Sequence, residues 1–245
     1  MSQETAIASF KKFQQSWIEQ LQHHLNYLRS AQNHHRNSVT GDEERLREAV
    51  ERVMKHFREF HRAKWATTET DVVGVMAAPW SSALERSLHW VGGWRPTTLF
   101  HLVYTESSIL FESRIVDILR GFRTGDLSDL SPSQFSRIKF VKGRTVSELQ
   151  CETVKEENAI TEELSEWQDD ASELVMGTSS NPEQRIRRLA EIVHRTDDLR
   201  LRTITRVVEL LSPLQQAEFL IAAAELRAGV AGWGTSHDRR RSSNV

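Results

Sequence analysis

The sequence predicts an all-α fold, arranged as a single-domain helical bundle. Apolar side chains recur at helical spacing along most of the chain, and the sustained apolar–polar alternation of strands is almost absent. The chain has five prolines and eleven glycines among 245 residues, which is few for a turn-rich β fold. Three of the five prolines also share one helix-start pattern.

That pattern places a capping residue before the proline and a glutamine three positions after the cap. Proline suits the first helical position because its missing N–H would have no helical partner there. The glutamine side chain can reach back to the backbone of the cap. Helices are therefore predicted to start at Ser131-Pro132-Ser133-Gln134, Asn181-Pro182-Glu183-Gln184 and Ser212-Pro213-Leu214-Gln215.

The other element boundaries come from apolar spacing and from glycine and proline positions. Pro79 and Pro96 are each expected to open a helix, and Gly92-Gly93 breaks the chain between them. Gly125-Asp126 is expected to form a turn before the longest helix. The expected elements are helices over 5–37 and 42–65, a loop over 67–78, and helices over 79–91, 96–122, 132–176, 182–210 and 212–228.

Opposite charges follow one another along the last third of the chain. The helix expected over 132–176 is strongly acidic, and the helix expected over 182–210 carries seven arginines. A short connection makes the two antiparallel neighbours, so we expect their charges to pair. Binding of phosphate or DNA by the arginines is the alternative. On the acidic helix, five apolar residues are spaced by 4, 3, 4 and 3 positions: Ile160, Leu164, Trp167, Ala171 and Leu174. This spacing predicts a coiled-coil-like seam.

Composition excludes several classes of protein. A formal net charge of -2 excludes a polycationic nucleic-acid coat. The single cysteine, Cys151, excludes an internal disulfide framework and favours a reducing compartment. No stretch approaches the ~20 apolar residues of a membrane span, and the N-terminus lacks a secretion signal. We therefore expect a soluble protein of the nucleus and cytoplasm.

Motifs of catalysis and metal binding are missing from the sequence. Gly92-Gly93 is not followed by the Lys-Ser/Thr of a phosphate-binding loop. Di-iron bundles need two Glu-x-x-His pairs, and only Glu191-Ile192-Val193-His194 is present. Cys151 has no neighbouring base to activate it. We expect no enzyme activity and no metal, and no direct DNA binding because zinc-finger and basic-zipper patterns are absent.

Three tryptophans, Trp80, Trp90 and Trp94, lie around Gly92-Gly93 in the densest aromatic region. We expect them to pack in the core at a helix–Gly-Gly–helix corner rather than to form a ligand box. Arg95 either satisfies carbonyl groups at the end of the preceding helix or pairs with a carboxylate.

This region resembles the hallmark of the plant delay-of-germination family, whose domain is shared with the C-terminal region of TGA-type bZIP transcription factors. In that family a Trp-x-x-x-Leu-Glu-Arg/Asn segment leads into Trp-x-Gly-Gly-x-Arg-Pro. The matching residues are Trp80, Leu84, Glu85, Arg86, Trp90, Gly92, Gly93, Trp94, Arg95 and Pro96. Further similar elements follow in order at 129–134, 197–203, 211–220 and 233–234.

The resemblance implies a delay-of-germination-type helical domain over 10–236, preceded by an N-terminal extension over 1–9 and followed by a basic, flexible tail over 237–245. Because no bZIP region precedes the domain, we expect a stand-alone member of the family. The resemblance implies a non-enzymatic regulator of seed dormancy, germination and abscisic acid signalling or seed gene expression, acting through protein–protein interaction. The alternatives are a transcription-associated module recruited to DNA, and a sensor of haem or lipid.

The resemblance also implies candidate contact residues. Phe10, Phe13 and Trp17 are expected to form an exposed stripe that binds a clade A protein phosphatase 2C or a bZIP factor. The haem ligands of the family's founder correspond to Arg227 and Ala231, so no haem is expected. A nuclear import signal or phosphate contact is expected at Arg239, Arg240 and Arg241. No membrane partner is expected, and a homodimer is compatible with the sequence.

Overall fold

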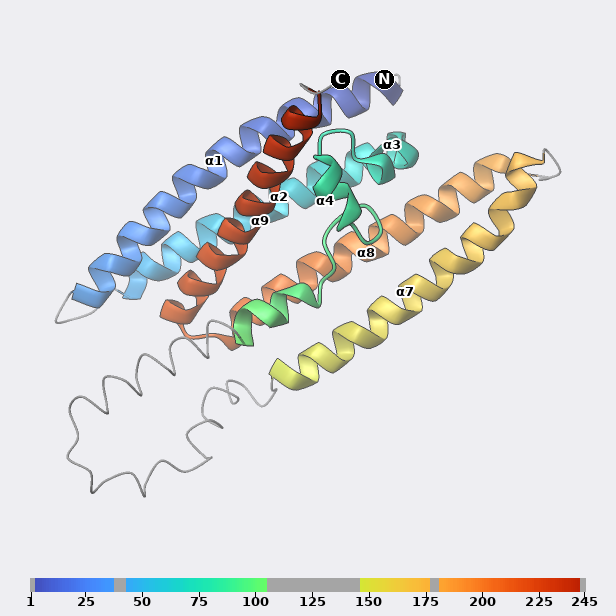
Figure 1. The fold of residues 1–245 in the computed structure, drawn as a ribbon. Coiled ribbons are helices and arrows are strands. Elements are labelled where there is room, and N and C mark those ends of the chain that lie inside the picture. The colour runs from blue at the N-terminus through green and yellow to red at the C-terminus, as the bar shows by residue number, and fades with distance from the viewer. Residues whose placement is uncertain (1–2, 38–42, 105–145, 177–180, 243–245) are drawn as a thin grey trace.

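The computed structural model describes residues 3–37, 43–104, 146–176 and 181–242, and it places no strand among them (Figure 1). The all-α prediction is confirmed. The helices are α1 (Gln3–Asn37), α2 (Glu43–Thr70), α3 (Val72–Ala77), α4 (Ala83–Ser87), a helical segment over 98–104, α7 (Val146–Val175), α8 (Pro182–Leu210) and α9 (Pro213–Ser242).

Two long helix pairs and one crossing helix make up the bundle. α1 packs against α2, and α7 packs against α8. α8 also contacts α2, and α9 lies over α1, α2 and α4 (Figure 1). The larger core cluster joins α1, α2, α8, α9 and the 98–104 segment, with Trp17, Phe100 and Phe219 among its most buried side chains. Each such side chain contributes about 1.5–3 kcal/mol through burial.

The two starts with the cap–proline–glutamine pattern that the structure describes, at Pro182 and Pro213, are confirmed. At the start of α8, Asn181 Oδ1 accepts a hydrogen bond of 3.0 Å from the Gln184 N–H, with Pro182 at the first helical position. At the start of α9, the Ser212 N–H donates to Gln215 Oε1 at 3.0 Å. The start expected at Pro132 and the turn at Gly125-Asp126 lie outside the described residues.

Two predictions near residue 75 are wrong. The loop expected over 67–78 is the end of α2 followed by α3, because Asp71 caps α3 by accepting from the Gly74 N–H at 2.8 Å. Pro79 opens no helix. α4 starts instead at Ala83, where the Glu85 carboxylate accepts from both the backbone N–H and the hydroxyl of Ser82 at 2.8 Å.

α9 is longer than the 212–228 helix that the sequence predicts. It continues to Ser242 and so includes residues 237–242, which we expected to form a flexible tail. Asp238 in this last part accepts a hydrogen bond of 2.9 Å from the Ala83 N–H of α4. At the other end of the chain, α1 begins at Gln3, within the expected N-terminal extension.

The acidic and basic helices pair as predicted, with ion pairs along α7 and α8. Arg206, Arg202 and Arg188 lie 3.4, 2.7 and 3.1 Å from Glu152, Glu156 and Glu166, respectively, and Arg195 pairs with Glu163. In the described part of the seam, Ile160 is buried, and Leu164 and Trp167 pack against its core cluster. Each exposed pair is worth ~0–1 kcal/mol, so the pairs add little to the stability of the fold. No helix in the described ranges is long and apolar enough to cross a membrane.

Candidate functional site

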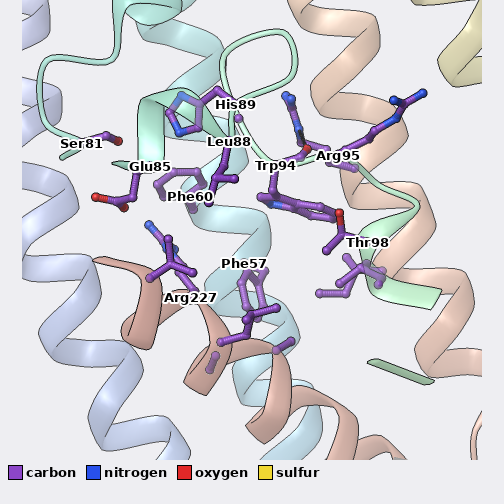
Figure 2. Close-up of a pocket in the computed structure, with 18 of the residues that line it drawn as sticks. Phe57, Phe60, Ser81, Glu85, Leu88, His89, Trp94, Arg95, Thr98 and Arg227 are labelled. Atoms are coloured by element: carbon purple, nitrogen blue, oxygen red, sulfur yellow. Dashed lines mark hydrogen bonds between the residues drawn. The ribbon is translucent and has the colours of Figure 1, made fainter. Parts of the chain in front are cut away.

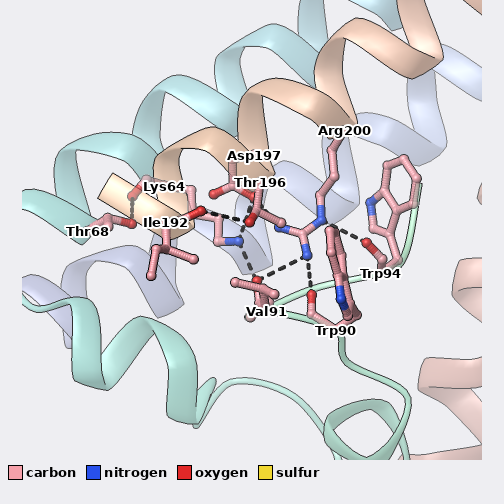
Figure 3. A network of polar contacts seen from close by, with 10 residues as sticks. Lys64, Thr68, Trp90, Val91, Trp94, Ile192, Thr196, Asp197 and Arg200 are labelled. Carbon is pink, nitrogen blue, oxygen red and sulfur yellow. Dashed lines mark hydrogen bonds and ion pairs between the residues drawn. The ribbon is translucent and has the colours of Figure 1, made fainter. Parts of the chain in front are cut away.

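The Trp-Gly-Gly corner is built around one arginine from a distant helix (Figure 3). Arg200 of α8 donates from Nε to the Trp94 carbonyl at 2.7 Å and from Nη2 to the Val91 carbonyl at 3.0 Å. Nη2 also donates to the Trp90 carbonyl. A single buried guanidinium therefore fixes the backbone of the corner, and its planar set of donors suits this task.

A buried charge network holds this arginine in place (Figure 3). Asp197 Oδ1 accepts from Arg200 Nη1 at 2.6 Å and from Lys64 Nζ at 2.9 Å, and Lys64 also donates to the Gly92 carbonyl at 3.0 Å. Burial alone would raise the pKa of Asp197, but the two cations outweigh burial and hold this pKa at about 2. Burial lowers the pKa of Lys64 to about 8, although the negative charge of Asp197 acts to raise it.

The paired glycines meet two different geometric needs of the corner. Gly92 has φ +69°, in the left-handed region that favours glycine. A Cβ on Gly93 would lie only 3.0 Å from Cζ of Arg200. The corner is closed by backbone hydrogen bonds in both directions between Trp90 and Gly93.

A buried carboxylate connects the corner to α7. Glu157 is 1% exposed and accepts from Arg95 Nε at 2.7 Å and from the Thr97 N–H at 2.7 Å. The carboxylate alternative for Arg95 is thus confirmed. The indole N–H of Trp90 donates to the hydroxyl of Thr161, which also lies on α7, at 3.1 Å.

The other residues of the hallmark also have structural contacts. Trp80 packs edge-on against Phe10 with ring centroids 4.7 Å apart. Glu85 caps α4, and Arg86 donates to the Ser81 carbonyl at 2.5 Å. Trp80, Trp90 and Trp94 are all partly buried against the two core clusters. Core packing therefore describes these tryptophans, although Trp80 and Trp94 also line a cavity.

The cavity lies between the corner and α9 and has a volume of about 410 Å³ (Figure 2). Its walls include apolar side chains of α2, α9 and the corner, among them Phe57, Phe60 and Trp94. Its polar groups include Arg227 of α9 and the Lys64–Asp197–Arg200 network. A mainly apolar cavity with a few converging polar groups is typical of a small-molecule site.

The stripe of Phe10, Phe13 and Trp17 is not exposed as we expected. Phe10 is 3% and Trp17 is 1% exposed, and Phe13 is partly buried, because this face of α1 packs on α2. The Trp17 indole donates to the His56 carbonyl at 2.9 Å and stacks on the His56 ring at 4.7 Å. Phe10 and Trp17 therefore pack inside the domain, and Phe13 packs against its core.

Arg227 and Ala231, the two positions that the resemblance matches to the founder's haem ligands, lie on α9. Arg227 lines the cavity, and Ala231 follows one turn later. A guanidinium cation and a methyl group supply no lone pair to iron, so these side chains do not fit haem. The three arginines Arg239, Arg240 and Arg241 are exposed in the last turns of α9.

Sequence reasoning missed the buried charges at Lys64, Asp197 and Arg200 and the histidine His61 beside the cavity. The i, i+3 pair of Asp197 and Arg200 continues the helical spacing of the apolar residues Val193, Ile204 and Val207 on α8, which was a usable signal. Lys64 carries no such signal, because its partner Asp197 is 133 positions away in the chain.

Lowering the pH is expected to destabilise the fold through His61. Burial lowers the pKa of His61 from 6.5 to about 4, with Lys64, Arg200 and Arg227 opposing its charge and Asp197 favouring it. The unfolded chain therefore binds a proton at higher pH than the folded chain does. The resulting stability is complete above pH 6.5 and is lost as the pH falls toward 4.

Urea unfolding measured between about pH 7 and pH 5 checks this expectation. The slope of unfolding free energy against pH should be shallower in His61→Gln than in the parent protein. Equal slopes would show that His61 does not titrate differently in the two states.

Comparisons with known proteins agree with the hallmark. Residues 24–105 match the family profile described as "DOG1: Seed dormancy control". The chain is 26% identical over 243 residues to Protein DOG1-like 4 of Arabidopsis thaliana, covering 92% of this chain and 91% of that protein. It is 26% identical over 245 residues to Transcription factor TGA1 of the same plant, covering 94% of this chain and 58% of TGA1. Transcription factor TGA2.3 of Oryza sativa subsp. japonica is 35% identical over 102 residues, 42% of this chain and 30% of that factor. The resemblance stated from the sequence is therefore confirmed.

Proposed function

We propose that this DOG1-like chain is a non-enzymatic regulator of seed dormancy and germination that acts by binding another protein. The observation that carries the proposal is the similarity to DOG1-like 4 over 92% of the chain. It is supported by the structural role of residues in the family elements, since Arg200 binds backbone carbonyls of the corner, and Glu85 and Arg86 bind backbone groups of Ser82 and Ser81 just before α4. We extend the proposal to abscisic acid signalling and to action in the nucleus and cytoplasm.

The outer face of α9 is the partner surface that we propose in place of the buried aromatic stripe. Leu226 is 45% and Trp233 is 56% exposed, seven residues apart on the same face of the helix. Tryptophan is enriched among the residues that dominate the binding energy of protein interfaces. The candidate partners are a clade A protein phosphatase 2C and a TGA-type bZIP factor.

The second candidate function is a transcription-associated module, favoured by the similarity to TGA1 over 94% of the chain. In this case the chain reaches DNA through a bZIP partner. The exposed Arg239, Arg240 and Arg241 would then serve nuclear import.

Removing the Trp233 side chain is expected to weaken partner capture at least several-fold while leaving the fold intact. Trp233→Ala deletes an exposed aromatic side chain of the type that often dominates interface energies. Trp65→Ala, which removes another exposed tryptophan from α2, is the matched control. Both variants are compared with the parent chain in affinity capture of purified phosphatase and bZIP factor.

Capture of the phosphatase supports the signalling role, and capture of the bZIP factor alone supports the transcription-associated role. Capture of neither partner by the parent chain would contradict both. Equal loss in Trp233→Ala and Trp65→Ala would contradict the proposed surface.

A further inference from the structure

The last part of α9 extends beyond the core, and we call its residues 228–241 the α9 arm. Of these residues, all of which lie in the described part of the chain, Gly234 is the only one that is buried. The buried apolar side chains of α9 end earlier, at Ala224. A segment with few buried contacts opens locally at a low cost in free energy. The docking of the arm therefore depends on the contact at Gly234.

Gly234 brings the arm against the start of α4. A Cβ atom at Gly234 would lie 2.2 Å from Ser82 Oγ and 2.9 Å from Ser82 Cβ, so α9 crosses Ser82 at a distance that only glycine allows. One turn later on α9, the Asp238 carboxylate accepts a hydrogen bond of 2.9 Å from the Ala83 N–H. Because Gly234 and Asp238 are four positions apart, they share one face of the helix, and this face meets α4.

The same contact completes the cap of α4. Ser82 Oγ accepts from the Glu85 N–H at 3.3 Å, and the Ala83 N–H is satisfied instead by Asp238. A carboxylate at the start of a helix also meets the positive end of the helix dipole. The cap of α4 is thus shared between its own Ser82 and the arm, which fixes the position of the arm along α4.

Two further glycines lie in the arm without a contact of this kind. Gly229 and Gly232 are exposed, and among the described residues a Cβ at either would meet no atom within 4 Å outside its own stretch of helix. A glycine inside a helix lowers the helix–coil equilibrium about fivefold relative to alanine. These two glycines therefore weaken the helix between the core and the contact at Gly234.

We propose that the arm works as a latch, in which Gly234 and Asp238 dock it on Ser82 and Ala83 of α4 and only the docked arm presents Trp233 to a protein partner. The role of Trp233 rests on the proposed function, whereas the docking is a property of the isolated chain. Gly234 and Asp238 are thus positioning residues of the partner surface.

The position of Trp233 supports this link between docking and partner binding. Trp233 directly precedes Gly234, is 56% exposed and stacks on His237 with ring centroids 5.6 Å apart. Because Gly234 faces α4, the docked arm holds its neighbour Trp233 toward solvent on a fixed helix. A side chain that is already fixed loses less conformational entropy when a partner binds.

Matched glycine substitutions test the latch in the full chain without a partner. Gly234→Ala favours the helix but places a methyl group against Ser82, so amide hydrogen exchange in residues 228–241 is expected to become about tenfold faster. Gly232→Ala, where space is open, is the control and should slow exchange by up to about fivefold. Unchanged or slower exchange in Gly234→Ala would overturn the latch, because helix propensity alone predicts slower exchange.

A compensating substitution separates this contact from a general loss of helix. Ser82→Gly removes both side-chain atoms that the added methyl group meets within 3.0 Å, and glycine is a tolerated capping residue. The remaining neighbour, Leu84 Cβ at 3.2 Å, needs to move only slightly. The double variant Gly234→Ala/Ser82→Gly is expected to regain most of the slow exchange that Gly234→Ala loses. No recovery would overturn the contact assigned to Gly234 and Ser82.

The same variants test the consequence for partner binding. Gly234→Ala should lower capture of the purified phosphatase or bZIP factor at least several-fold, Gly232→Ala should capture as the parent does, and the double variant should regain capture. Capture by Gly234→Ala equal to that of the parent, despite faster exchange of its arm, would overturn the role of the latch in presenting Trp233. Capture of neither partner by the parent would overturn this role together with the proposed function, whereas the exchange result for the latch would stand.

Discussion

Replacing Asp197 by asparagine is expected to lower the free energy of unfolding by about 3–5 kcal/mol, the usual cost of breaking a buried ion pair from one side. The substitution keeps the shape of the side chain and removes only its charge. Lys64 and Arg200, which are 4% and 1% exposed, would then share a buried site with no compensating anion. The corner should loosen as well, since both cations also hold its carbonyl groups.

The neighbouring residue supplies the control for this prediction. Asp198→Asn removes a carboxylate that pairs with Arg202 at 2.9 Å on the exposed face of the same helix. Its expected cost is below about 1 kcal/mol because solvent screens exposed pairs. Urea unfolding of both variants gives the comparison. Similar losses for Asp197→Asn and Asp198→Asn would show that burial of the network does not determine its contribution.

A double variant tests the physical cause. Lys64→Met combined with Asp197→Leu removes one cation together with the anion. It should recover part of the stability lost in Asp197→Leu alone, because one uncompensated charge is removed from the buried site. The absence of any recovery would indicate that the loss comes from misfit of the side chain rather than from unpaired charge.

Replacing Trp17 by alanine is expected to cost about 3–5 kcal/mol of unfolding free energy, the range for deleting a buried aromatic side chain. Trp17 is 1% exposed, and its ring stacks on the His56 ring and also contacts the Arg227 guanidinium. The variant also leaves the His56 carbonyl without its indole donor. Denaturant unfolding measures the loss, and Trp233→Ala, with its exposed side chain, is the control expected to change stability by less than about 0.5 kcal/mol.

Trp17→Phe separates packing from hydrogen bonding at this position. Phenylalanine retains an aromatic ring but has no N–H, so its cost should be smaller than that of alanine. A stability of Trp17→Ala equal to that of the parent would contradict the buried position. A loss of partner binding in Trp17→Ala is therefore expected to follow unfolding, which is why the partner surface is tested at Trp233.

The helices themselves could be predicted from the sequence because their signals are local. The cap at Asn181 with Pro182 acts within four residues, and it starts α8 where predicted. The acidic and basic helices are consecutive in the chain, so their pairing followed from one short connection. The proline rule alone failed at Pro79, because the capping box of Ser82 and Glu85, which begins three residues later, starts α4 instead.

The direction in which a residue faces could not be predicted where the partner is remote. Phe10 and Trp17 look the same in the sequence whether their stripe faces solvent or α2, and only the packing of α1 on α2 decides this. The sequence by itself determined the all-α class, the order of the long helices and the family hallmark, because periodicity, capping and motifs are contained in short segments. The tertiary structure alone decided that Asp197 meets Lys64 and that Arg227 faces a cavity, because burial and charge pairing depend on which distant segments share one space.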